Sequence, residues 1–253
     1  MMSILEMLVQ EWQQILGAKL VGIYLHGSLC LGGFQAETSD IDLLVVIEEE
    51  MADAEKNKLK LMLSILNHLD DYPQKGLEMS VVLCKDIQKP SFPMPYSLHF
   101  SPMYLCEAKQ DSLAYAQKMH GYDDDLAVHL TITKEKGIAL YGPNPQQLFA
   151  SIPKQAYLDS ILQDLKDGQF GIFENPGYYI LNLCRTLAYL KDDLILSKDD
   201  GGKWALTKSN QHISTIKKAL LERQNNKVNY SQDELRIFYR DYMDLILNKQ
   251  QLS

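Results

Sequence analysis

The stretch YLHGSLCLGGFQAETSDIDLLVVI, residues 24–47, decides the fold of this chain. A first apolar run leads into the pair Gly27-Ser28, and a glycine-containing loop then leads to the sequence SDID at residues 39–42. The apolar run at residues 43–47 is short, partly β-branched and bounded by polar residues, which predicts a buried strand. We therefore expect two strands here, separated by a glycine-containing turn and a loop.

Two acidic side chains stand at the start of the second strand. Because side chains alternate between the faces of a strand, Asp40 and Asp42 point the same way, while Ile41 and Leu43 point into a core. Two carboxylates on one face repel each other unless a cation lies between them, and Mg²⁺ prefers such oxygen ligands together with a substrate phosphate. Isolated acidic residues at a strand start are usually solvated caps, but the complete pattern favours a metal site.

The glycine-serine pair supplies the other half of this pattern. If Gly27-Ser28 ends the first strand and begins a helix, its backbone N–H groups and the Ser28 hydroxyl can bind an anion. Glycine at this point lets a phosphate approach the backbone closely. Ser39 either joins this phosphate site or only caps the turn before the second strand. A phosphate-binding turn beside a metal site is the combination that nucleotidyl transfer requires.

The motif GS…SDIDLLVV resembles the signature of the DNA polymerase β-like nucleotidyltransferases. More narrowly, the chain resembles the aminoglycoside adenylyltransferases, which modify streptomycin and spectinomycin. Further matching segments are LEMSVV at 77–82, DLAVHLTITKEKGIALYGP at 125–143, and LNLCRTLAYL…LSKDDGGKWAL at 181–206. The first motif is specific for the superfamily, and the later segments point to the antibiotic-modifying branch.

The resemblance implies an α+β fold with two domains. The nucleotidyltransferase domain, residues 1–150, would hold a small mixed sheet with flanking helices, and residues 151–253 would form an all-α helical bundle. Apolar periodicity independently predicts helices at 4–16, 51–69, 157–165, 178–190, 213–221 and 235–247, and strands at 20–25, 40–47 and 77–83. The proline-rich segment 89–102 predicts a long wrapping loop, and residues 196–202 a second loop.

Glu78 lies in the strand predicted at 77–83, where an acidic side chain is costly to bury without a partner. If this strand lies beside the strand of Asp40 and Asp42, Glu78 faces the same cleft. The resemblance implies that Glu78 is the general base for the attacking hydroxyl, or a third metal ligand. A surface glutamate on an edge strand is the alternative.

Other residue roles come only from the resemblance. Lys198 matches a lysine that binds the nucleotide triphosphate, although a solvated surface lysine is the alternative. Asn175 stands where the family has an acidic residue for the cationic drug, and the adjacent Glu174 could take over that contact. Tyr104 lies in the region where the family has a tryptophan that contacts streptomycin. These departures leave the acceptor open. His129 is interpreted as a structural histidine.

Composition limits the class of protein. The formal charge of −8 argues against generic nucleic-acid binding and suits a cationic substrate. The four cysteines have no paired metal-ligand spacing, and the chain shows no signal peptide or membrane-spanning run. We therefore expect a cytoplasmic protein with reduced cysteines, acting as a monomer without nucleic-acid or membrane partners.

The function implied by the resemblance is transfer of AMP from ATP, with Mg²⁺, to a hydroxyl of an aminoglycoside-type antibiotic, which would confer antibiotic resistance. The substrate would be held between the two domains. One alternative is a superfamily member acting on a lincosamide or a protein hydroxyl, and another is a non-catalytic nucleotide sensor or antitoxin. The presence of Ser28, Asp40, Asp42 and Glu78 favours an enzyme.

Overall fold

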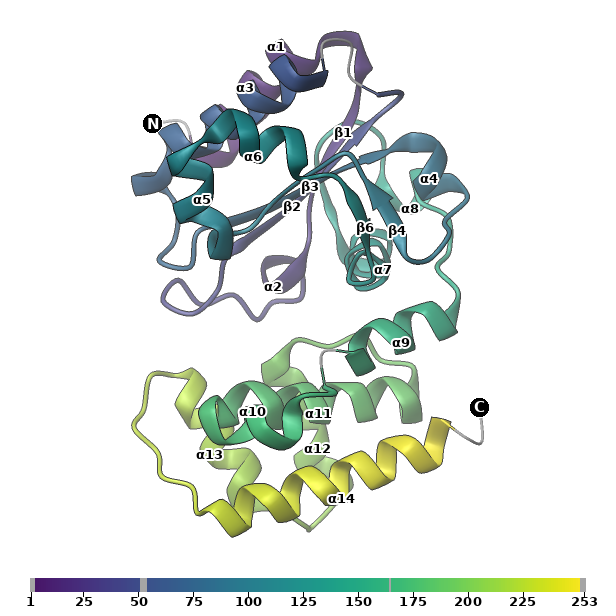
Figure 1. The fold of residues 1–253 in the computed structure, drawn as a ribbon. Helices are drawn as coiled ribbons and strands as arrows, with labels where there is room; N and C mark the ends of the chain where they lie inside the picture. Colours follow the sequence, from purple (N-terminus) through teal and green to yellow (C-terminus); the bar gives the residue numbers. More distant parts are fainter. Residues whose placement is uncertain (1–2, 51–53, 164, 251–253) are drawn as a thin grey trace. The chain divides into compact units, whose positions relative to one another are not determined.

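The structure is a computed structural model that describes residues 3–50, 54–163 and 165–250. It divides into two compact units, Met1–Tyr157 and Leu158–Ser253 (Figure 1). The division falls within helix α9 (Lys154–Gln163), whereas the boundary expected between residues 150 and 151 precedes that helix. The predicted domain limits stay a prediction.

The first unit is built on a five-stranded sheet with the order β5-β3-β2-β1-β7. Its strands are β1 (Leu20–Leu25), β2 (Ile41–Ile47), β3 (Leu77–Leu83), β5 (Leu98–Phe100) and β7 (Ile138–Tyr141). Strands β2 and β3 are parallel, and the other neighbouring pairs are antiparallel. The sheet is therefore mixed, which confirms the expected fold class.

One face of this sheet is covered by helices from the amino-terminal part of the unit and from the segment after β5. Leu43, Val45 and Met79 belong to a buried cluster that also contains Trp12 of α1. The covering helices are α1 (Ile4–Leu16), α3 (Ala54–Asn67), α5 (Leu105–Gln110) and α6 (Ser112–Lys118), as Figure 1 shows. Because side chains alternate between the two faces of a strand, this face holds one part of the core of the first unit.

The opposite face carries Leu44, Val46 and Val82 in a second buried cluster. Helices α4 (Cys84–Gln88), α7 (Leu126–Lys136) and α8 (Pro145–Leu148) contribute to it. By the same alternation, Asp42 and Glu78 point to this second face at the amino-terminal ends of their strands. Helix α7 is therefore in a position to bring side chains toward these carboxylates.

The segment expected as one wrapping loop contains regular structure, so that part of the prediction was wrong. Strand β4 (Met94–Tyr96) pairs with β6 (Gly121–Asp123) in a separate two-stranded sheet, and β5 forms the edge of the main sheet. Proline suits a short edge strand such as β4, where its missing N–H breaks no interior ladder. Strand β7 was also missed, because it is a short edge strand without alternating burial.

The second unit is helical in the part that the structure describes. After α9 it contains α10 (Gly168–Glu174), α11 (Pro176–Asp192), α12 (Lys198–Lys208), α13 (Ile213–Arg223) and α14 (Gln232–Gln250). Buried residues of α10 to α14, including Ile180, Leu183, Ile216 and Phe238, form one apolar core. This arrangement confirms the expected helical region, although α10 was not predicted.

Helix α12 replaces most of the loop expected at 196–202. Ser197 caps the helix, since its hydroxyl accepts a hydrogen bond from the backbone N–H of Asp200 at 3.1 Å. Gly201 and Gly202 are both buried inside the helix. A Cβ at Gly201 would lie 2.7 Å from the Cβ of Arg185 on α11, so close helix packing explains the glycine.

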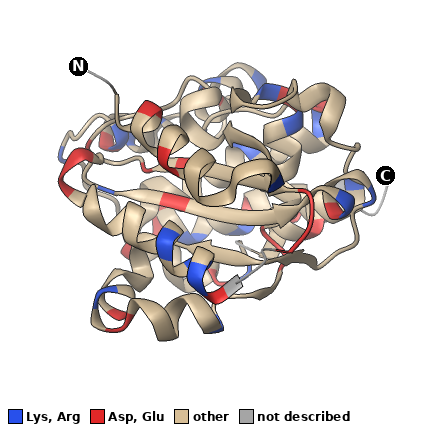
Figure 2. Cartoon of the chain, turned by 90° about the horizontal axis from the view of Figure 1, so that it is seen from above, with Lys and Arg blue, Asp and Glu red and all other residues tan. Residues whose placement is uncertain are grey.

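The remaining short elements are α2 (Gly27–Cys30) and the 3₁₀ turns Gly17–Lys19, Leu69–Asp71 and Pro102–Tyr104. In the view of Figure 2, acidic and basic residues are interspersed over many elements. Among the described helices, none combines the length and apolar character needed to cross a membrane.

Candidate active site

Two acidic residues on neighbouring strands are brought into register at one end of the sheet. Strand β2 runs parallel to β3, with Asp42 paired to Glu78. The backbone N–H of Ile41 donates to the carbonyl oxygen of Gly76 at 3.0 Å, which aligns the beginnings of the two strands. The structure therefore places the Asp42 and Glu78 side chains next to each other on one face, as the sequence predicted conditionally.

The turn at Gly27 approaches Asp42 so closely that only glycine fits. Gly27 has φ +64°, and a Cβ on it would lie 1.8 Å from Oδ2 of Asp42. Helix α2 begins at Gly27, and the backbone N–H of Ser28 donates a hydrogen bond to the Asp42 carboxylate. The Ser28 Oγ is buried and has no hydrogen-bond partner within the described structure. An unsatisfied buried hydroxyl is costly and marks a candidate ligand contact.

The charge of Asp42 is disfavoured in this environment. Burial raises its pKa from 3.8 to about 7, and the carboxylates of Asp40 and Glu78 add to the rise. His129 and the hydrogen bond from Ser28 act in the opposite direction without cancelling it. A carboxylate whose charge is disfavoured in this way is suited to bind a positively charged partner.

His129, which the sequence analysis interpreted as a structural histidine, lies beside the carboxylates. Its Nε2 lies 3.9 Å from Oε1 of Glu78. Burial opposes the charged form of His129, but four nearby carboxylates together outweigh that effect and raise its pKa: those of Glu78, Asp42, Asp123 and Asp125. The neighbouring His26 is buried, and both burial and the charge of His129 lower its pKa well below the usual value. The sequence offered one indication of this position, a histidine among the apolar residues of α7. Which side chains surround that histidine depends on how the helix packs.

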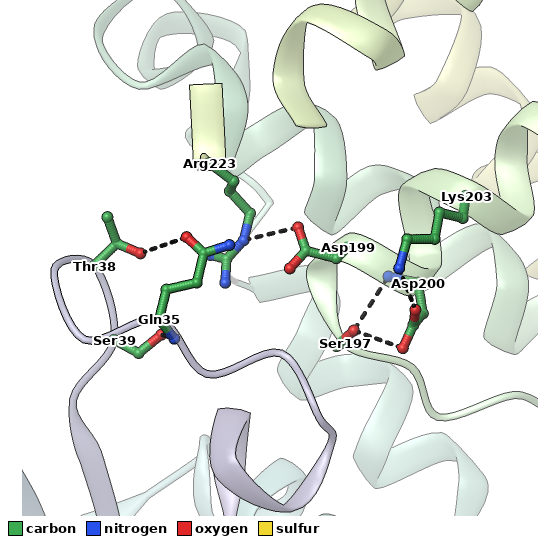
Figure 3. Close-up of polar contacts among 8 residues, drawn as sticks. All are labelled: Gln35, Thr38, Ser39, Ser197, Asp199, Asp200, Lys203 and Arg223. Atoms are coloured by element: carbon green, nitrogen blue, oxygen red, sulfur yellow. Dashed lines mark hydrogen bonds and ion pairs between the residues drawn. The ribbon is translucent and has the colours of Figure 1, made fainter. Parts of the chain in front are cut away.

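The loop between the glycine turn and β2 is closed by its own hydrogen bonds. Ser39 is buried, and its Oγ accepts from the backbone N–H of Gln35 at 3.1 Å. The hydroxyl of Thr38 donates to Oε1 of Gln35 at 3.1 Å (Figure 3). These contacts match a turn-closing role for Ser39, and its expected part in nucleotide binding stays a prediction. Asp40 directly precedes β2 and raises the pKa of Asp42.

Tyr104 lies in the same unit as Glu78 and belongs to an aromatic cluster. Its ring meets those of His99 and Tyr115 edge-on or tilted, with centroids 6.4 Å and 6.2 Å apart. His99 Nδ1 is 2.9 Å from Oγ of Ser80, which follows Glu78 on the same face of β3. The cluster therefore connects Tyr104 to the strand that carries Glu78. A contact of Tyr104 with substrate stays a prediction.

A metal site with three protein ligands does not form in the described residues. No three His, Cys, Asp or Glu side chains among them converge closely enough to hold an ion. Asp40, Asp42 and Glu78 are therefore not brought together as a three-ligand set. Asp40 and Asp42 still interact electrostatically, and oxygen ligands of this kind suit Mg²⁺, which commonly uses one or two carboxylates plus substrate phosphates.

In the second unit, Lys198 is the first residue of α12, and its ammonium lies 4.7 Å from the centroid of the Tyr178 ring. Figure 3 shows two polar contacts of the same helix. Asp199 accepts from Nε of Arg223 at 3.1 Å, and Asp200 pairs with Lys203 at 3.1 Å. The start of α12 therefore carries charges of both signs.

The other expected substrate residues of this unit lie at a helix junction. Glu174 ends α10, and Asn175 connects α10 to α11; both are exposed. A cavity of about 300 Å³ between α11, α12 and α14 is lined by neither of them, nor by Lys198. Ligand contacts of these three residues stay predictions.

Two stretches of the chain match known domains. Residues 2–96 match the nucleotidyltransferase domain, and residues 147–244 match the C-terminal domain of aminoglycoside adenylyltransferases. The chain belongs to the aminoglycoside adenylyltransferase family of nucleotidyltransferases. The first match contains the Gly27 turn, Asp40, Asp42 and Glu78, and the second contains Lys198.

Curated relatives of this family agree with that assignment. A spectinomycin 9-adenylyltransferase of Staphylococcus aureus is 25% identical over 77% of this chain and 74% of its own length. A Campylobacter jejuni protein of the same name is 26% identical over 83% and 81%. An aminoglycoside (3'') (9) adenylyltransferase of Klebsiella pneumoniae is 26% identical over 74% and 71%.

A solved structure has the same fold. The spectinomycin adenyltransferase AAD(9) from Enterococcus faecialis, determined with ATP and spectinomycin, matches with a TM-score of 0.77. The match covers 96% of this chain and 98% of that protein at 18% identity. The aligned residues include both units, and at this identity the likeness is one of fold alone.

We expect replacement of Asp42 by asparagine to stabilise the metal-free protein at pH 8. Because the folded state raises the pKa of Asp42 from 3.8 to about 7, it binds the proton more tightly than the unfolded state. Stability is therefore lost as the pH rises through this interval. Asp42→Asn removes the penalty, on the order of 4 kcal/mol at pH 8 and less at pH 5.

Urea unfolding in EDTA at the two pH values would measure this difference. Asp86→Asn, on helix α4, serves as the control. A variant Asp42→Asn that is less stable than the unsubstituted protein at pH 8 would contradict the electrostatic interpretation.

Proposed function

We propose that this protein transfers AMP from ATP to a hydroxyl group of a spectinomycin- or streptomycin-type antibiotic and releases pyrophosphate. The observation that carries the proposal is the register of Asp42 with Glu78, beside a turn that only glycine can form at Gly27. The named activities of the relatives, spectinomycin 9- and aminoglycoside (3'') (9) adenylylation, support this reaction class.

The glycine turn would bind the triphosphate. The absence of a side chain at Gly27 lets the turn pack against the Asp42 carboxylate, and the unsatisfied Oγ of Ser28 offers a donor to a phosphate. For Lys198 we propose a point charge on a nucleotide polyphosphate, as the family resemblance implies. These contacts bind and orient ATP so that its α-phosphorus can be attacked in line.

Asp40 and Asp42 would hold Mg²⁺. The donor set fits, because both are hard oxygen ligands and the charge of Asp42 is disfavoured without a cation. When bound, the ion neutralises charge on the triphosphate and on the departing pyrophosphate. Asp42 is also held by the Ser28 N–H, which fixes the orientation of its carboxylate.

Glu78 would act as the general base. Its carboxylate accepts the proton of the acceptor hydroxyl while the hydroxyl oxygen forms a bond to the α-phosphorus. The bond from the α-phosphorus to the bridging oxygen breaks, and that electron pair leaves with pyrophosphate. A third-ligand role for Glu78 is the less supported assignment, because no three-ligand set forms among the described side chains.

The acceptor is proposed to be cationic. The formal charge of −8 favours the approach of a polyamine-like drug. Tyr104, Glu174 and Asn175 are the candidates for contacting it, as an aromatic surface, an anion and an amide. We further propose that the enzyme is cytoplasmic, where its co-substrate ATP is available, and that it acts as a monomer.

The reaction is tested by pyrophosphate release from ATP and Mg²⁺ across streptomycin, spectinomycin, other aminoglycosides and lincosamides. We expect release with a drug of the first two types, and expect Asp42→Asn to reduce it to background. Mass spectrometry should show the drug heavier by one AMP moiety. Release that persists in Asp42→Asn, or that occurs only with lincosamides, would contradict the proposal.

Glu78→Gln separates binding from proton removal. Because glutamine keeps the shape of the side chain but accepts the proton poorly, turnover should fall roughly 10²- to 10⁴-fold. The KM for ATP should change less than about threefold, since binding does not use the base. Steady-state kinetics with the accepted drug would measure both parameters. Near-normal turnover would show that Glu78 is not the base.

Lys198→Ala tests the triphosphate contact. Loss of the ammonium charge should raise the KM for ATP about tenfold, while the KM for the drug stays near its original value. Lys203→Ala is a matched control, because Lys203 lies on the same helix and pairs with Asp200. An equal increase in the KM for ATP in both variants would show an effect on helix α12 as a whole and contradict a specific contact of Lys198 with the triphosphate.

A further inference from the structure

Helix α7 delivers a histidine to the carboxylate proposed as the base, and the proposed mechanism does not use it. We propose that His129 is the positioning residue of Glu78, whose imidazole N–H at Nε2 holds the carboxylate toward the acceptor hydroxyl. This inference rests on the proposed function, because it assigns a task to the Glu78 carboxylate. It deepens that proposal by adding a residue outside the strand and turn motifs.

The geometry places the two groups opposite each other. His129 lies in the first turn of α7, and its Nε2 is 3.9 Å from Oε1 of Glu78, within ion-pair distance. The two side chains are only 20% and 25% exposed, so water screens their attraction less than at the open surface. Helix α7 lies over the face of the sheet to which Glu78 points.

The imidazole of His129 is itself held in place. Its ring lies against that of His26, with centroids 4.9 Å apart and planes inclined by 40°. His26 is 2% exposed and directly precedes the Gly27 turn, so it provides a fixed surface. The carbonyl oxygen of His129 accepts from the hydroxyl of Thr133 at 2.7 Å, which anchors its backbone. An imidazole that packs on a buried ring and extends from an anchored backbone can hold a flexible neighbour.

Glu78 needs such a partner because of its other neighbour. A glutamate side chain has three rotatable bonds, and its carboxylate is repelled by the paired Asp42 on β2. Repulsion from Asp42 favours conformers of Glu78 that point away from it, but it does not select one of them. A hydrogen-bond donor on one side does. His129 therefore supplies direction, and a displaced base loses turnover even when substrates bind normally.

Three substitutions of His129 test the contact. His129→Leu removes the donor, His129→Asn shortens it, and His129→Gln keeps an N–H near the position of Nε2. We expect Leu and Asn to lower kcat by about 10- to 100-fold, with the KM for ATP and drug within about threefold. His129→Gln should recover kcat to within about threefold of the unsubstituted enzyme. Equal losses in all three variants would overturn the proposal.

A double-mutant cycle gives the sharper result. If His129 acts by positioning Glu78, then His129→Leu should cost less than about twofold when added to Glu78→Gln, because no carboxylate remains to be positioned. His120→Leu, at an exposed histidine, is the control and should leave kcat unchanged. A full 10- to 100-fold loss in the Glu78→Gln background would show that His129 acts elsewhere.

A readout without turnover separates this inference from the proposed function. Crystal structures without substrates should show one Glu78 conformer in the unsubstituted protein and in His129→Gln, and several conformers in His129→Leu. An enzyme inactive with every drug but with this difference in Glu78 would contradict the proposed function and support the positioning role. An active enzyme whose Glu78 conformer is identical in all variants would overturn the positioning role alone.

Discussion

The close approach of the Gly27 turn to the Asp42 carboxylate is the constraint on which the first unit depends. A Cβ at Gly27 would overlap Oδ2 of Asp42, and the N–H of Ser28 donates to the same carboxylate. This contact requires β1 and β2 to pair with their polar ends together. The parallel pairing of β2 with β3 then brings Glu78 alongside. One approach of backbone to carboxylate thus organises three strands around a single polar end.

That arrangement is electrostatically unfavourable in the protein alone. Burial raises the pKa of Asp42 to about 7, and the carboxylates of Asp40 and Glu78 add to the cost of its charge. The apolar clusters on both faces of the sheet offset this cost. Arrangements that lower the stability of the folded state are commonly found at sites of binding or chemistry. Here the unfavourable charge is what a metal cation, and beside it a histidine, can relieve.

Prediction from sequence succeeded where structure depends on near neighbours. The helix at Ile4–Leu16 and the strands at Leu20–Leu25 and Leu77–Leu83 follow from periodicity that a few residues display. It failed where packing overrides local preference. Residues 196–202 were expected to form a loop, but Gly201 lies inside α12, where close contact with Arg185 requires a glycine. Strand β7 exists because β1 offers it an edge, which no local pattern reveals.

The sequence by itself determined the chemistry of the strand and turn motifs. Spacing of two residues places Asp40 and Asp42 on one face, since alternation is a property of the extended backbone. Only the tertiary structure decided the surroundings of these groups. The register of Asp42 with Glu78 needs two strands to pair, and the approach of His129 needs α7 to pack on the sheet. Such contacts join segments far apart in the chain, so they arise from burial of the common core rather than from any local pattern.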